Sequence, residues 1–110
     1  MAKIVISPLA RADMREIADY ISRNLCNPNV ALRMVQRFRK TIAPLAEFPE
    51  MGSPLPAHGK QGISYYYLVC GSYMIFYFIA DGRVMVDRVL YGRRDYMAIL
   101  FGDQLEEEEE

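Results

Sequence analysis

Apolar residues recur at helical spacing through the first half of the chain, after a short β-type run at residues 3–7. Ser7 and Pro8 form a cap-then-proline signal that marks the start of a helix, and Asn27 and Pro28 repeat it. Two apolar stripes follow these signals: Met14, Ile17, Ala18, Ile21 and Leu25, then Ala31, Met34, Val35, Phe38, Ile42 and Leu45. The pattern predicts amphipathic helices over residues 8–25 and from residue 28 to Phe48-Pro49, the second disturbed at Pro44. Such a helical hairpin needs a flat surface to pack on.

Strand-like segments fill the second half, after a loop over residues 49–62 that is rich in proline and glycine. Residues 63–70, 73–79 and 83–91 are aromatic and aliphatic, and turns at Gly71-Ser72 and Asp81-Gly82 separate them. The third segment is apolar on both faces, which indicates a central place in the sheet. Asp95 can cap a short helix over residues 96–101. We therefore predict an α+β fold, in which an N-terminal strand and a helical hairpin pack on an antiparallel three-strand meander, followed by a short C-terminal helix.

Charge is unevenly distributed along the 110 residues, which suit one domain with a single core. We assign residues 1–102 to that domain and residues 103–110 to an acidic tail. A compact core cannot use such a run of like charges, so the tail is a candidate for disorder. Glu106 to Glu110 account for five of the 14 acidic residues, so nine remain against 13 Lys and Arg and the body carries +4. Ten of those cations are arginine, which suits phosphate or carboxylate recognition.

Several classes of protein are disfavoured. The longest apolar runs are far too short to cross a bilayer, and the first residues lack the apolar stretch of a secretory signal, so we expect a cytoplasmic protein. Cys26 and Cys70 stand far apart with no Cys-x-x-Cys pattern and no neighbouring histidine, which favours buried structural thiols. No spacing supports a metal, dinucleotide or flavin site, and we expect no cofactor.

The main candidate site is the segment from Asp87 to Tyr96, where an apolar strand runs into three arginines and two tyrosines. Its members are Arg88, Tyr91, Arg93, Arg94 and Tyr96. Guanidinium groups bind phosphate or carboxylate and tyrosine rings stack, so the segment could hold a nucleic-acid backbone or an acidic protein partner. The alternative is a solvated loop, in which Arg93, Arg94 and Asp95 form only weak local ion pairs.

Other residues are weaker candidates. Lys60 is a further candidate for nucleic-acid binding, whereas His58 lacks an identifiable carboxylate to orient it and is better explained as an incidental loop residue. Arg33, Arg37 and Lys40 recur at helical spacing, which a solvated helix face explains better than a docking stripe. Tyr65, Tyr66, Tyr67, Tyr73 and Tyr77 are equally suited to core packing and to partner contact. Because Tyr66 must face away from Tyr65 and Tyr67, at least one side of the sheet should be partly wet.

Five segments in their order along the chain carry a family resemblance. They are Ser7-Pro8-Leu9-Ala10-Arg11-Ala12-Asp13-Met14, Ile17-Ala18-Asp19-Tyr20-Ile21, Phe48-Pro49-Glu50-Met51-Gly52, Gly71-Ser72-Tyr73-Met74-Ile75-Phe76-Tyr77 and Arg88-Val89-Leu90-Tyr91-Gly92-Arg93-Arg94-Asp95-Tyr96. Together with the order of predicted elements, they resemble the RelE/ParE toxins of bacterial type II toxin-antitoxin systems over nearly the whole chain. The resemblance implies a small toxin held silent by a cognate antitoxin protein.

Members of that family either cleave messenger RNA on the ribosome or inhibit DNA gyrase, and the fold does not decide between them. For a metal-independent ribonuclease, the resemblance implies that Arg88, Arg93 and Arg94 hold the phosphate and that Tyr91 or Tyr96 stacks or moves a proton.

The chain departs from the ribonuclease pattern in three places. It has no Lys or Arg between Lys60 and Arg83, Met74 stands where relatives often have arginine, and Tyr91 stands where many have histidine. We therefore expect mRNA cleavage only narrowly ahead of gyrase inhibition, with an inactive, protein-binding relative as a third reading.

Overall fold

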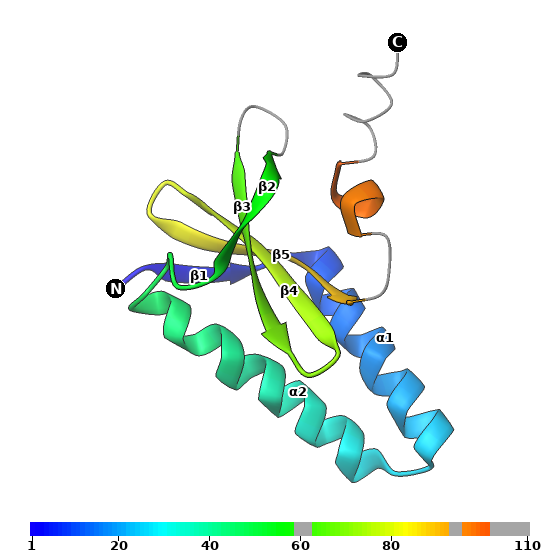
Figure 1. Cartoon of the computed structure of the whole chain (residues 1–110). Coiled ribbons are helices and arrows are strands. Elements are labelled where there is room, and N and C mark those ends of the chain that lie inside the picture. Colours follow the sequence, from blue (N-terminus) through cyan, green and yellow to red (C-terminus); the bar gives the residue numbers. More distant parts are fainter. Residues whose placement is uncertain (59–62, 93–95, 102–110) are drawn as a thin grey trace.

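The computed structural model describes residues 1–58, 63–92 and 96–101. The chain opens with strand β1 (Lys3–Ile6), helix α1 (Pro8–Leu25) and helix α2 (Pro28–Ile42), and a 3₁₀ turn η1 (Ala43–Ala46) follows directly. Strands β2 (Ser53–His58), β3 (Ser64–Cys70), β4 (Tyr73–Ala80) and β5 (Arg83–Tyr91) come next, and residues 96–101 are helical. Figure 1 shows α1 and α2 diverging from their connecting turn beneath the sheet. The predicted α+β fold is confirmed.

The sheet has five strands in the order β1-β5-β4-β3-β2. Strand β5 lies in the interior of the sheet, as its two apolar faces predicted: β1 pairs with it in parallel on one side and β4 pairs with it antiparallel on the other. The meander is larger than expected. Residues 53–58 were predicted as loop but form β2, which pairs with β3 at the edge of the sheet with a register shift between Pro54 and His58. Proline has no N–H, and it is tolerated in an edge strand because backbone positions that face away from the sheet have no partner strand to bond.

Side-chain caps start both long helices where the sequence predicted. The Ser7 hydroxyl accepts a hydrogen bond from the Ala10 amide at 2.9 Å and donates one to the Asp87 carbonyl at 2.7 Å, so the cap also ties α1 to β5. The Asn27 side chain accepts from the Asn29 amide at 3.1 Å. Helix α2 ends at Ile42, earlier than predicted, because Pro44 lacks the amide needed to continue it and the chain tightens into η1.

Two hydrophobic clusters lie on opposite faces of the sheet. The larger is formed by α1, α2 and the strand residues that face them, including Ala10, Phe38, Ile75, Tyr77 and Val86. The smaller contains Leu55, Phe76, Leu90 and Phe101, so residues 96–101 cover the second face. Tyr66 packs with the first cluster and Tyr65 and Tyr67 with the second, as strand alternation requires, and all three rings are half-buried.

Candidate functional site

An ion pair joins the first helix to the last strand. The Arg88 Nε lies 2.7 Å from Oδ2 of Asp13, and its Nη2 lies 2.8 Å from Oδ1, which makes the contact bidentate. Oδ2 also accepts a hydrogen bond from the Val89 amide at 2.9 Å. Asp13 is buried, with only 7% of its surface exposed, and its hydrogen bonds raise the pKa of the Arg88 guanidinium. Two of the guanidinium nitrogens are therefore occupied inside the protein.

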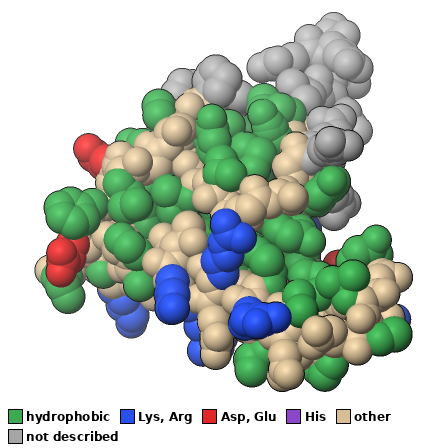
Figure 2. Space-filling view, turned by 60° about the horizontal axis from the view of Figure 1, so that its bottom comes forward, with side chains coloured by type: hydrophobic (Ala, Val, Ile, Leu, Met, Phe, Trp, Pro, Cys, Tyr) green, Lys and Arg blue, Asp and Glu red, His purple; other side chains and the backbone are tan. Residues whose placement is uncertain are grey.

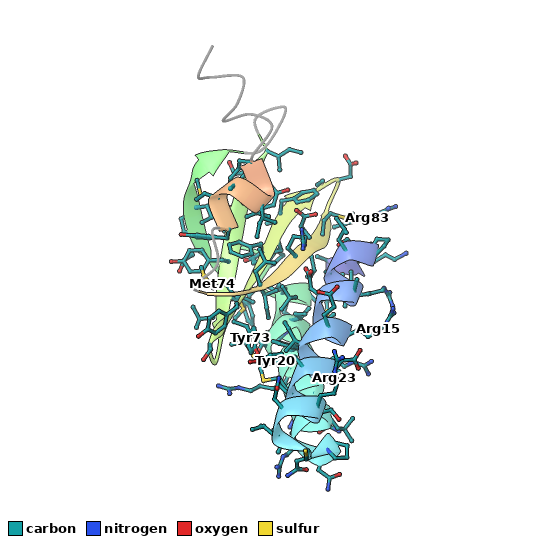
Figure 3. The ribbon with its side chains drawn as sticks, turned by 90° about the vertical axis from the view of Figure 1, so that its right-hand side faces the viewer. Arg15, Tyr20, Arg23, Tyr73, Met74 and Arg83 are labelled. Carbon is teal, nitrogen blue, oxygen red and sulfur yellow. The ribbon has the colours of Figure 1, made fainter. Side chains whose placement is uncertain are left out.

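Tyr91 borders a cavity between α1 and the ends of β4 and β5. We call it the aromatic cavity; it measures about 830 Å³ and is lined by Glu16, Tyr20, Arg23, Tyr73 and Tyr91. Figure 3 shows Tyr20 and Arg23 on α1 with Tyr73 beside that helix. The Tyr73 and Tyr91 rings meet edge to face with centroids 5.9 Å apart, and Tyr91 is 40% exposed. The site thus presents tyrosine rings next to one cation and one anion.

Burial raises the pKa of Tyr73, and the neighbouring phenols of Tyr91 and Tyr20 raise it further. A raised pKa keeps the Tyr73 hydroxyl protonated at neutral pH. The group is then a hydrogen-bond donor and a poor base.

Tyr96 lies on the opposite face of the sheet from the aromatic cavity. Its ring meets Phe76 edge to face with centroids 5.2 Å apart, and it packs against the smaller hydrophobic cluster. The structure does not bring Tyr91 and Tyr96 together, because they approach the sheet from different sides. The two residues, which were predicted as alternatives for one stacking or proton-transfer role, therefore belong to different surroundings, and only Tyr91 borders the aromatic cavity.

The remaining predicted site residues lie outside the residues that the structure describes: Lys60, Arg93 and Arg94. Asp95 and the acidic tail at residues 103–110 also lie outside them. His58 was expected in a loop but is the last residue of β2, where it pairs with Ser64. Within the described ranges, no group of three or more His, Cys, Asp or Glu residues is placed to hold a metal ion.

Two smaller predictions have mixed outcomes. Cys70 is buried as expected, but Cys26 is exposed at the end of α1, so the prediction of two buried thiols was wrong for Cys26. Arg33, Arg37 and Lys40 are all exposed on α2, as both a solvated helix face and a docking stripe require. No helix among the described residues has the length and apolar character required to span a membrane.

Comparison with known proteins identifies the family. A family model described as ParE toxin of type II toxin-antitoxin system, parDE, matches residues 4–96. The chain belongs to this toxin family. It is 34% identical over 94 residues to toxin RelE2 of Caulobacter vibrioides, an alignment covering 86% of this chain and 99% of that one. A solved structure of the chromosomal ParDE toxin-antitoxin system of P. aeruginosa has a TM-score of 0.67 at 21% identity, covering 83% of this chain and 96% of that one, and supports the fold alone.

This ParE-family chain is accordingly the toxin of a type II toxin-antitoxin module, and its partner is a cognate antitoxin. Sequence reasoning had named Tyr91 but missed the residues of α1 that meet the end of β5: Asp13, Glu16, Tyr20 and Arg23. A signal for Asp13 was present. It lies three residues after Ala10 and four before Ile17, so a carboxylate falls on the apolar stripe and needs a buried partner.

Proposed function

We propose that this toxin acts by binding a protein target without cleaving RNA, and that the target is DNA gyrase. The observation that carries the proposal is the ion pair between Asp13 and Arg88. A phosphate ligand needs free guanidinium N–H groups, and Arg88 uses its Nε and Nη2 on a carboxylate of its own chain. Charge stabilisation of the kind that dominates phosphate chemistry is thereby weakened at this position.

The aromatic cavity supports the protein-binding reading. Tyrosine and arginine are enriched among the residues that carry most of the binding energy at protein interfaces, and here Tyr20, Tyr91 and Arg23 border one hollow. Tyr20 is largely exposed and Tyr91 partly so, so both rings can reach a partner. Glu16 and Arg23 supply one charge of each sign, which can orient a docked segment.

Ribosome-dependent mRNA cleavage is the second candidate, favoured by the exposed ring of Tyr91 and by the three arginines of the segment 88–94. An unstacked base could rest on that ring while Arg93 and Arg94 hold the backbone. Both targets are cytoplasmic, so we also propose that compartment for the toxin. The two candidates differ in whether a bond is broken.

Parallel assays separate them. Purified toxin is added to gyrase with relaxed plasmid, and separately to translating ribosomes with a defined message whose ends are mapped. We expect supercoiling to fall and the message to stay intact. Message cutting with normal supercoiling would select the ribonuclease instead.

Variants test whether the aromatic cavity is the gyrase contact. Tyr20→Ala and Tyr91→Ala should each weaken gyrase inhibition about 10-fold or more. Leu32→Ser on the outer side of α2 is the control, because Leu32 is also exposed and does not line the cavity. Full inhibition by both tyrosine variants would place the contact elsewhere.

A further inference from the structure

A second surface lies at the other end of the sheet. Phe48 and Met51 are 61% and 50% exposed, although both are large and apolar. With Pro49, Glu50 and Ile79 they line a groove of about 530 Å³, and Phe48 also borders a neighbouring hollow of about 450 Å³. We call residues 48–51 the Phe48 ridge. Figure 2 shows one face of the molecule, on which broad hydrophobic areas are interrupted by Lys and Arg side chains and acidic side chains lie toward one edge.

The Phe48 ridge is held in place from below by a buried tyrosine. The Tyr77 hydroxyl donates to the Pro49 carbonyl at 2.8 Å and accepts from the Gly52 amide at 2.9 Å. Inside the ridge, the Met51 amide donates to the Phe48 carbonyl at 3.1 Å, and the Phe48 amide to the Pro44 carbonyl at 2.9 Å. These bonds hold the backbone that presents two exposed apolar side chains, so binding a partner carries a smaller cost of ordering the chain, which is typical of an interface.

Charge around the ridge indicates the chemistry of the partner. Among the described residues that line the groove, Glu50 is the charged one, whereas the neighbouring hollow has one charge of each sign, Glu47 and Lys40. An apolar groove with the Glu50 carboxylate at its margin favours a segment whose apolar side chain is flanked by Lys or Arg.

The position of the ridge separates it from the aromatic cavity. Ile79 lies near the end of β4 and Tyr73 at its start, six residues apart, which places the two sites about 20 Å from each other along the strand. The direct line along β4 between the two sites passes Ile75 and Tyr77, which are fully buried in the larger hydrophobic cluster. A partner chain that holds the ridge and also reaches the cavity therefore follows the surface, over more than the roughly six extended residues that would match the direct distance.

We propose that the Phe48 ridge docks the cognate antitoxin, through an antitoxin segment that carries an apolar anchor next to a Lys or Arg. The proposal rests on the antitoxin partner and does not depend on which target the toxin attacks. Anchoring at the ridge leaves the rest of the antitoxin within reach of the aromatic cavity, so that it can block target binding there.

The test measures the affinity of purified cognate antitoxin for toxin variants by calorimetry. The double variant Phe48→Ser, Met51→Ser should bind about 10- to 100-fold more weakly, in the range of interface anchor residues. Glu50→Lys keeps the apolar surface but reverses a margin charge, and should weaken binding about 10-fold. Leu9→Ser, at a position 58% exposed on α1, is the matched control and should bind like the parent toxin. Melting curves of each variant exclude unfolding as the cause.

Unchanged affinity in the double variant and in Glu50→Lys would overturn the proposal, as would failure of the parent toxin to bind the antitoxin. The same variants are assayed for gyrase inhibition without antitoxin, where we expect full activity. Loss of inhibition with retained antitoxin binding would assign the ridge to the target and also overturn the proposal. If gyrase is not the target, the calorimetry still measures antitoxin docking at the ridge. A failure of the proposed function is therefore distinguishable from a failure of this proposal.

Discussion

Asp13 of α1 and Arg88 of β5 form a two-point contact, with nitrogen to oxygen distances of 2.7 and 2.8 Å. The same carboxylate caps the Val89 amide, so three hydrogen bonds converge on one buried group. The pair joins residues 75 positions apart and fixes the first helix against the last strand, immediately before the end of β5 that carries Tyr91.

Removing one partner of this pair should destabilise the fold. Arg88→Ala leaves the Asp13 carboxylate buried without its counter-charge, and we expect the free energy of unfolding to fall by about 3–5 kcal/mol in urea denaturation. Arg83→Ala is the control, since Arg83 is exposed at the start of β5. It should change the free energy of unfolding by about 0.5 kcal/mol or less. A small loss for Arg88→Ala would show that the guanidinium is available for another role. In that case phosphate binding by Arg88 would regain support.

The Tyr77 hydroxyl should be essential to the segment that carries Phe48. Tyr77→Phe leaves the Gly52 amide and the Pro49 carbonyl without their partner, at a cost of about 1–3 kcal/mol. Gly52→Ala should be at least as harmful, because its added Cβ would lie 2.6 Å from the Tyr77 hydroxyl and 2.9 Å from the Tyr67 carbonyl. Thermal unfolding measures both. Gly82→Ala is the matched control for space, because a Cβ there meets no atom within 4 Å, although its positive φ adds some strain.

Stability should fall in alkaline solution. Burial raises the pKa of Tyr65, Tyr73 and Tyr77, and the hydrogen bond that Tyr65 donates to Asp87 raises the first further. In the unfolded chain these phenols ionise near pH 10. Above that pH the unfolded state loses protons that the folded state retains, so the stability present below pH 10 is lost as pH rises toward the folded pKa values.

Phenolate absorbance follows this titration. Of the eight tyrosines, we expect a group to ionise only above pH 10 in the folded toxin, and all to ionise together in urea. Tyr65→Phe should remove one member of the late group. Identical folded and unfolded titration curves would contradict the assignment.

Arg93 and Arg94 remain sequence-based candidates. Replacing both with alanine should abolish growth arrest in cells while leaving the melting temperature unchanged, because the guanidinium groups are expected to act on an anionic partner. Lys3→Ala is a charge control at an exposed position of β1. Undiminished toxicity of the double variant would remove both arginines from the site.

The local signals in the sequence were reliable. Ser7 and Asn27 cap the helices as predicted, because a short polar side chain before proline satisfies an orphan amide without tertiary help. Strand β2 escaped detection because Pro54 and Pro56 suggest a loop, and only its place at the sheet edge makes a strand possible there. The parallel pairing of β1 with β5 has no local signal, since its partners lie 80 residues apart.

The candidate site was harder to predict because its residues come together only in the tertiary structure. The arginine cluster drew attention to Arg88, yet what Arg88 contacts depends on a helix at the other end of the chain. Tyr91 was named, but the aromatic cavity it borders is completed by Glu16, Tyr20 and Arg23 of α1. Strand alternation placed Tyr66 opposite Tyr65 and Tyr67 correctly, because that relation is local to one strand.

The pairing of Lys3–Ile6 with residues 83–86 also has a kinetic consequence. Such a long-range parallel contact closes a large loop, so the sheet reaches its full width late in folding. A polypeptide emerging from the ribosome cannot close this sheet until residue 86 is available. Until then the toxin lacks the strand end on which its proposed target site is built.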